Sequence, residues 1–156
     1  MTTSKNRWAM RVMWKLHRFW YRASGGRVGR RVAGLPVLRL TTTGRTSGEA
    51  RSVMLTYLDD PRGFIVIASN AGDQRDPAWW RNLEADPHAS IRVGRKTYAI
   101  RMRQLEGDER EQAWQRAVAA FDGYAKYAAS TERTIPVALL DKGDVAEFSG
   151  RITWES

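Results

Sequence analysis

The chain of 156 residues contains no cysteine and only two histidines, His17 and His88. The missing thiols exclude disulfide bonds and thiolate metal ligands, and two imidazoles are too few for a histidine-rich zinc site. Charged residues interrupt every apolar run well before the roughly 20 residues that a membrane-spanning helix needs. Lysines and arginines recur through the first 31 positions, so we do not expect a secretory signal sequence there.

Acidic residues are absent from the first 31 positions, which hold nine of the 26 basic residues. The other 17 basic residues balance the 17 acidic ones, so the net charge of +9 belongs to this N-terminal arm. The body, residues 32–156, is neutral and is long enough for one folded domain. A nucleic-acid-binding domain more often carries its charge on the folded body, and we therefore expect no nucleic-acid partner.

The arm has the pattern of an amphipathic helix. Its basic side chains recur every three or four residues along one helical stripe: Arg7, Arg11, Lys15, Arg18 and Arg22. Apolar side chains collect on the opposite side: Trp8, Val12, Met13, Leu16, Phe19 and Trp20. Such a helix is typical of a membrane interface, so residues 5–23 are predicted to contact an anionic membrane. The alternatives are packing on the body or on a second subunit of a homodimer.

The body reads as sheet hairpins with short helices between them. β-rich segments lie at 37–43, 51–58, 64–69, 90–93, 97–105 and 135–140. One helix is predicted at 77–85, with Asp76 as its N-cap and Pro77 at its first position. A second is predicted at 108–120, with the buried stripe Trp114, Ala117, Val118 and Phe121. Strands and helices do not alternate regularly, which predicts an α+β fold built on an antiparallel barrel.

A turn bounded by Gly44 and Gly48 joins the first two strands. Glycine adopts conformations that allow a tight reversal, with N–H groups directed outward. The turn and the start of the next strand carry Arg45, Thr46, Ser47 and Arg51. Outward N–H groups and guanidinium groups suit a phosphate or carboxylate ligand, although an ordinary polar hairpin has the same composition.

Several catalytic motifs are missing. The chain has no GxGxxG or GxxxxGKS phosphate loop and no GxSxG nucleophile elbow. Asp73 and Asp76 share a loop, either as an acid–base pair or, more simply, as solvated carboxylates. A pocket without a thiol, a metal site or an activated nucleophile fits an enzyme whose cofactor carries the chemistry.

Four further segments, at 67–72, 76–87, 123–127 and 133–137, follow the glycine turn at characteristic spacing. In this order they resemble the deazaflavin-dependent nitroreductase family, also called coenzyme F420-dependent quinone reductases, over about residues 35–140. The resemblance implies the split β-barrel of flavin-mononucleotide-binding proteins. It also implies coenzyme F420, an 8-hydroxy-5-deazaflavin that transfers hydride, as the cofactor.

The resemblance further implies which residues contact the cofactor. Its phosphate and oligoglutamate tail would lie against Arg45, Thr46, Ser47, Gly48 and Arg51. The ring would lie beside Ser52, Val53 and Met54 and beside Ile67, Ala68, Ser69 and Asn70. The tail side would be closed by Ala78, Trp79, Trp80, Arg81 and Asn82. For Trp79 and Trp80 the alternative is plain core packing.

Tyr124 and Tyr127 match the family's substrate-facing tyrosines, and Tyr124 would also contact the cofactor. With Ser69, they would stabilise the acceptor oxygen as charge builds on it. The alternative is that both tyrosines close a surface helix. Three departures from the family matter. Thr46 replaces a family lysine and Ala50 a proline, so Arg45 or Arg75 would have to compensate for the lost cation. Phe121 replaces a third aromatic hydroxyl, which makes the pocket more apolar and less suited to nitroimidazoles.

Together these features predict an oxidoreductase that passes hydride from reduced coenzyme F420 to a quinone, nitroaromatic or enone-type acceptor. We expect it in the cytoplasm, with the arm at the inner face of the cell membrane. One alternative keeps the barrel and changes the cofactor to flavin mononucleotide or haem. Another is a non-catalytic deazaflavin-binding or membrane-docking protein.

Overall fold

The computed structural model describes residues 31–32 and 34–143, and the predicted arm helix lies outside them. Strands β1 (Arg31–Val32), β2 (Leu35–Thr43), β3 (Ala50–Thr56), β4 (Leu58–Asp60) and β5 (Gly63–Ile67) come first. They are followed by η1 (Asn70–Gly72), α2 (Ala78–Ala85), β6 (His88–Val93), β7 (Lys96–Gln104), α3 (Gly107–Ala120), α4 (Gly123–Ala129) and β8 (Val137–Asp141). Among the described residues, no helix is long and apolar enough to cross a membrane.

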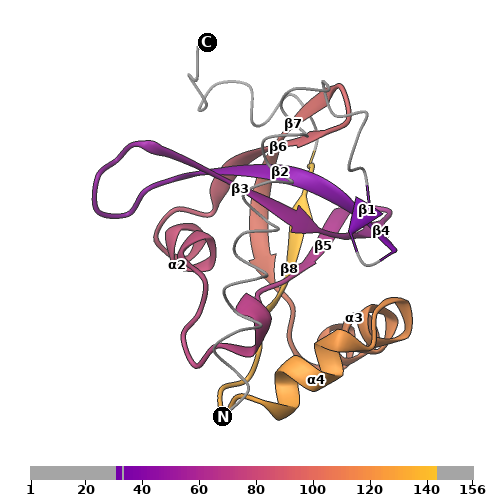
Figure 1. Cartoon of the computed structure of the whole chain (residues 1–156). Helices are drawn as coiled ribbons and strands as arrows, with labels where there is room; N and C mark the ends of the chain where they lie inside the picture. Colours follow the sequence, from indigo (N-terminus) through magenta and orange to yellow (C-terminus); the bar gives the residue numbers. More distant parts are fainter. Residues whose placement is uncertain (1–30, 33, 144–156) are drawn as a thin grey trace.

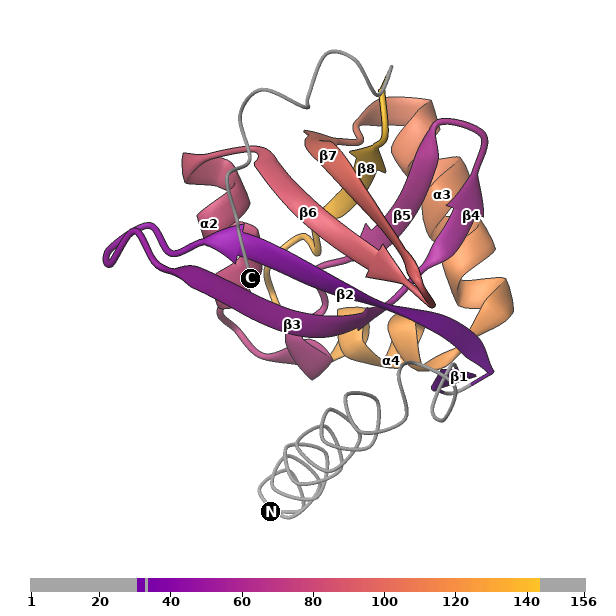
Figure 2. The same cartoon turned by 90° about the horizontal axis from the view of Figure 1, so that it is seen from above.

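The strands form one antiparallel sheet that curves into a half-open barrel (Figures 1 and 2). The order is β1-β2-β6-β7-β8-β5-β4, and β3 pairs with β2. Leu40 of β2 lies opposite Val53 on one side and Ile91 on the other, which sets the register of three strands. The predicted α+β split barrel is confirmed.

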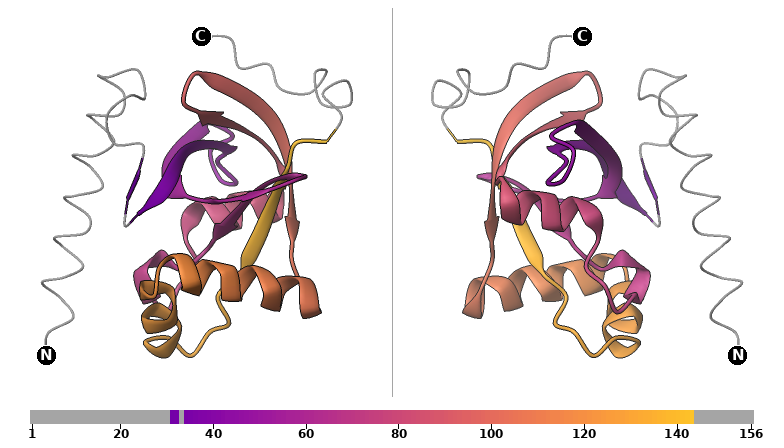
Figure 3. Two further views of the ribbon diagram at one scale, coloured as in Figure 1. Left: turned by 90° about the vertical axis from the view of Figure 1, so that its right-hand side faces the viewer. Right: turned by 90° about the vertical axis from the view of Figure 1, so that its left-hand side faces the viewer.

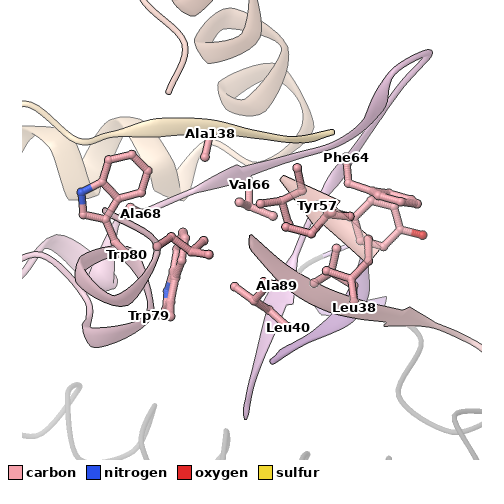
Figure 4. Packing of buried hydrophobic residues seen from close by; sticks show 14 residues of the cluster. Leu38, Leu40, Tyr57, Phe64, Val66, Ala68, Trp79, Trp80, Ala89 and Ala138 are labelled. Carbon is pink, nitrogen blue, oxygen red and sulfur yellow. The ribbon is translucent and has the colours of Figure 1, made fainter. Parts of the chain in front are cut away.

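Strand β5 is buried on both faces. Phe64 and Val66 pack in the barrel interior with Leu38, Leu40 and Trp80 (Figure 4). Ile65 and Ile67 point the other way and join a second cluster formed with α3 and α4. Strand β8 alternates in the same manner. Because neighbouring side chains of a strand point to opposite faces, two adjacent strands serve both cores.

Helices α3 and α4 lie together at one side of the barrel (Figure 3). Ala113 and Ala117 are the buried residues of α3. Trp114, Val118 and Phe121, which were predicted as its buried stripe with Ala117, pack at the edge of the second cluster and are only partly buried. The helix therefore presents small residues to the sheet and larger ones to α4.

The predicted strand at 51–58 is interrupted at Tyr57. The Tyr57 N–H donates to the carbonyl of Pro36 at 3.1 Å, and its ring meets Phe64 edge-on at 5.1 Å between centroids. After this contact with β2 the chain begins β4 at Leu58, which pairs with β5. The helix η1 was not predicted, since three residues are too short to show a helical period. Helix α4 was expected only as the alternative in which Tyr124 and Tyr127 close a surface helix.

Asp76 is not the N-cap of α2. The cap position belongs to Pro77, and the helix begins at Ala78. The Asp76 carboxylate instead accepts a hydrogen bond from Arg133 at 2.8 Å. A charged partner from a distant segment has replaced the local capping contact.

A charged network joins the β4–β5 turn to α3. Arg62 donates from Nε to Asp60 at 2.8 Å and from Nη1 to Glu109 at 3.2 Å. Arg103 of β7 donates to the same Glu109 carboxylate at 2.8 Å. The Arg62 guanidinium lowers the pKa of Asp60 from 3.8 to about 2.

This pKa predicts how stability depends on acidity. A depressed carboxylate pKa stabilises the fold above the unfolded-state value, and the contribution disappears as pH falls through the folded-state value. We therefore expect the free-energy difference between wild type and Asp60→Asn to shrink from about pH 4 to about pH 2, as measured by urea unfolding. The control is Asp59→Asn, the exposed neighbour. A constant difference across that range would contradict the prediction.

Candidate functional site

A cleft of about 1610 Å³ opens between the β2–β3 hairpin, the segment after β5, the first turns of α2 and helix α4. Small-molecule sites commonly measure about 300–1,000 Å³, so this one has room for a large cofactor and a second small molecule. Most predicted site residues line it: Arg45, Thr46, Ser47, Arg51, Ser52, Val53, Met54, Ile67, Ser69, Asn70, Ala78, Trp79, Asn82, Tyr124 and Tyr127.

Four predicted residues do not line the cleft. Gly48 lies in the turn with φ +71°, a conformation that favours glycine. Ala68 and Trp80 are buried in the barrel core, and Arg81 is exposed on α2. Core packing thus accounts for Trp80. Trp79 is also 93% buried, yet part of it faces the cleft.

The glycine turn is closed by its own backbone. The Gly44 N–H donates to the carbonyl of Glu49 at 2.7 Å, and the Gly48 N–H donates to the carbonyl of Gly44 at 2.8 Å. A side chain at Gly44 would come within 2.7 Å of the Ser47 hydroxyl. That hydroxyl accepts from Arg51 at 3.4 Å, so a side chain at Gly44 would displace the serine and disturb this contact.

Asn82 connects helix α2 to this turn. Its side-chain oxygen accepts from the Arg45 N–H at 3.2 Å and from the Arg45 guanidinium at 2.9 Å. Its amide N–H donates to the Thr42 hydroxyl at 3.1 Å, and both Asn82 and Thr42 are buried. Every polar contact of this amide is to the turn or the strand before it, so Asn82 orients Arg45 within the cleft wall.

The aromatic wall comes from the end of α3 and from α4. The rings of Phe121 and Tyr124 meet edge-on at 5.3 Å, and Tyr124 and Tyr127 at 6.3 Å. The Tyr124 hydroxyl lies 2.7 Å from the hydroxyl of Thr56 on β3. Burial raises the pKa of both tyrosines, in Tyr124 against the lowering effect of the Thr56 hydrogen bond. Both phenols are therefore neutral at physiological pH and able to donate a proton.

The sequence did not single out several other lining residues: Arg31, Val32, Leu35, Thr42, Leu55, Thr56, Ala71 and Pro77. Thr56 continues the alternation of Ser52 and Met54, so extending that period by one step would have found it. Leu35 and Leu55 look like ordinary strand residues and carried no signal. Their apolar side chains lie in the same lining as the aromatic wall.

The loop before α2 brings charge to the cleft. Asp73, Arg75 and Asp76 all belong to its lining. The Asp73 carboxylate accepts from the Arg75 N–H at 3.0 Å, while Asp76 is paired with Arg133. Asp76 is therefore neutralised by a cation rather than arranged as the partner of Asp73 in an acid–base pair.

Comparison with known proteins identifies the family of the chain. The family model for the F420H(2)-dependent quinone reductases matches residues 13–142. The F420H(2)-dependent quinone reductase Rv1261c of Mycobacterium tuberculosis is 35% identical over 132 residues, which cover 82% of this chain and 89% of that protein.

Solved structures show the same fold. The F420-H2 dependent reductase FDR-A is 38% identical over 68% of this chain and 94% of its own, with a TM-score of 0.63. A structure described as a domain-swapped dimer is 34% identical, covers 88% of this chain and 100% of its own, and has a TM-score of 0.65. The haem storage protein HutZ of Vibrio cholerae shares the fold alone, at 17% identity over 72% of this chain and 84% of its own, with a TM-score of 0.52. The chain belongs to the F420H(2)-dependent quinone reductase family.

Proposed function

We propose that this chain binds reduced coenzyme F420 in the cleft and reduces an apolar quinone there, at the surface of the cell membrane. The observation that carries the proposal is the asymmetry of the cleft lining. Three of the four lining arginines, Arg45, Arg51 and Arg75, lie at the glycine turn, the start of β3 and the loop before α2, whereas Phe121 and Tyr124 come from the end of α3 and from α4. A ligand with an anionic tail and an apolar ring fits such a lining.

The donor groups of the cleft suit this cofactor. Guanidinium groups and hydroxyls bind phosphate and carboxylate oxygens, so Arg45, Ser47 and Arg51 would hold the tail. Arg75 would supply the cation that Thr46 lacks. When bound, the reduced deazaflavin supplies a hydride. Ile67, Ser69 and Asn70 would orient the ring from the other side of the cleft.

Tyr124 is suited to stabilise the acceptor oxygen. Its hydroxyl can accept a hydrogen bond from Thr56, 2.7 Å away, and direct its own proton into the cleft. A buried donor aimed at developing negative charge stabilises a transition state more strongly than a donor in water does. Tyr127 and Ser69 line the same cleft and would assist.

The apolar lining favours a quinone over a more polar acceptor. Besides Tyr124 and Tyr127, the cleft lining includes apolar side chains that make no hydrogen bonds to a ligand: Val32, Leu35, Leu55 and Phe121. Nitroaromatic and enone acceptors present a similar oxygen and are tested as competitors. Lipid-soluble quinones reside in membranes, and the basic, amphipathic arm at residues 5–23 would bring the cleft to that surface, from the cytoplasmic side.

Within the proposed function, the first prediction concerns binding of the cofactor tail. Asn82→Ala removes the acceptor that orients Arg45, so we expect coenzyme F420 to bind about tenfold more weakly, as measured by quenching of deazaflavin fluorescence. Asn82→Asp keeps an acceptor for Arg45 but cannot donate to Thr42. Because it also places a negative charge beside Arg45, it should bind the anionic cofactor more weakly than wild type and unfold more easily. Equal affinity of Asn82→Ala and wild type would refute the role of this contact.

The second prediction tests the function itself. Wild type should oxidise reduced coenzyme F420 in the presence of a naphthoquinone, followed by the absorbance of the deazaflavin, and should not use flavin mononucleotide in its place. Tyr124→Phe should lower turnover about 100-fold with little change in cofactor affinity. Tyr98→Phe, at a ring outside the cleft lining, is the control. If wild type binds the cofactor but reduces no quinone, nitroaromatic or enone, the result would favour a non-catalytic deazaflavin-binding protein. Unchanged turnover in Tyr124→Phe would remove that phenol from the mechanism.

The third prediction concerns the membrane. The full chain should sediment with vesicles that contain anionic lipid and stay in solution with neutral vesicles, because each basic residue near an anionic surface contributes about 1 kcal/mol. Deleting residues 1–26 should abolish sedimentation. The triple substitution of Arg11, Lys15 and Arg18 by glutamine keeps the chain length and should weaken it strongly. Sedimentation of the truncated protein equal to that of the full chain would sink the membrane proposal.

A further inference from the structure

Arg133 lies just behind the cleft and makes four hydrogen bonds to the segment that forms one wall. Nε donates to the carbonyl of Asp73 at 2.9 Å, and Nη1 donates to the Asp76 carboxylate at 2.8 Å. Nη2 donates to the carbonyls of Ser69 at 2.8 Å and Ala68 at 3.1 Å. One planar group therefore connects the end of β5, the loop after η1 and the residue before the N-cap of α2. Its side chain is only 14% exposed.

The segment that Arg133 holds has an unfavourable backbone. Asn70 and Ala71 have φ angles of +45° and +53°, in the left-handed region that residues with a side chain seldom adopt. Such conformations persist where surrounding contacts determine the backbone. Ser69, Asn70 and Ala71 all line the cleft. The strained residues are thus the ones that face the ligand space.

The same connection reaches the tyrosine wall. Residues 130–133 follow α4, and the Thr131 hydroxyl lies 3.0 Å from the Gln74 side-chain oxygen. A side chain at Gly72 would collide with the Ser130 hydroxyl, so η1 and the end of α4 are in close contact. Arg133 therefore links the wall that carries Ser69 and Asn70 to the helix that carries Tyr124 and Tyr127.

We propose that Arg133 is a positioning residue. Its guanidinium holds the backbone of residues 68–73 in the conformation that faces the proposed site of the deazaflavin ring. The inference rests on the proposed function, in which the ring lies against this segment. Arginine is needed because its planar fork donates in several fixed directions, whereas lysine presents a single ammonium group. Lysine at this position would keep the charge and lose most of the carbonyl contacts.

The test compares Arg133→Lys with wild type in the full chain. Without cofactor, amide hydrogen exchange should accelerate at Gly72 and Asp73, which donate to Ser69 and Asn70, and stay unchanged within β5 and β8. The dissociation constant for coenzyme F420 should rise about tenfold, as expected if the competent loop conformation falls to a tenth of the population. The KM for reduced F420 should rise while the KM for the quinone does not.

Two further variants keep the result interpretable. Arg110→Lys also removes a partly buried bond from a guanidinium to a carbonyl, that of Ile135 at 2.7 Å, but neither residue lines the cleft. It should leave cofactor affinity and exchange at residues 69–73 unchanged. Asp76→Ala removes one of the four contacts and should produce an intermediate rise in the dissociation constant for coenzyme F420. This variant replaces Arg133→Lys in the test if Arg133→Lys does not fold.

The outcomes separate the two ideas. Wild type that does not bind coenzyme F420 overturns the proposed function and this inference with it. If wild type binds, then equal affinity in Arg133→Lys, or faster exchange spread evenly over the barrel, overturns the inference and leaves the function standing. Local exchange with weakened binding supports it.

Discussion

The burial of β5 and β8 on both faces is the constraint on which the rest of the structure depends. Phe64 and Val66 belong to the barrel interior, while Ile65 and Ile67 belong to the cluster under α3 and α4. Since both cores share these strands, hydrophobic packing determines where the helices sit relative to the barrel. The cleft opens where β5 ends, so Ile67, Ser69 and Asn70 belong to its lining.

Polar contacts across the cleft refine this arrangement. Asn82 joins α2 to β2 and the glycine turn, and Tyr124 joins α4 to β3 through Thr56. Both are buried polar groups whose hydrogen-bonding partners are present. Removing one partner would leave a buried group unsatisfied and would destabilise the fold. Rigid elements therefore carry the side chains that loops alone would leave mobile. The exposed turn that carries Arg45 is oriented by α2, a helix that is distant from the turn in the sequence.

Charge and apolar surface are divided along the cleft. By the family resemblance, Thr46 stands where a lysine is usual, and the loss of that cation would weaken binding of the cofactor tail. Arg75 belongs to the same lining and lies in the loop before α2, where its N–H contacts Asp73. The arginines of the cleft lining thus come from three segments: Arg31 of β1, Arg45 and Arg51 around the glycine turn, and Arg75 of the loop before α2. Phe121 in the opposite wall extends the apolar surface around the tyrosines, in keeping with an acceptor that prefers a membrane to water.

Local signals in the sequence determined much of this protein. The glycine pair predicted the turn, the β-rich segments predicted the hairpins of the sheet, and the family resemblance identified most of the cleft lining. Strand period and turn chemistry act over a few residues, so they can be read directly. Thr56 and Tyr124 are 68 residues apart, and Asp76 and Arg133 are 57 apart. Only the tertiary structure decided those contacts, because strand order and two-sided packing, rather than any local pattern, bring such distant residues together.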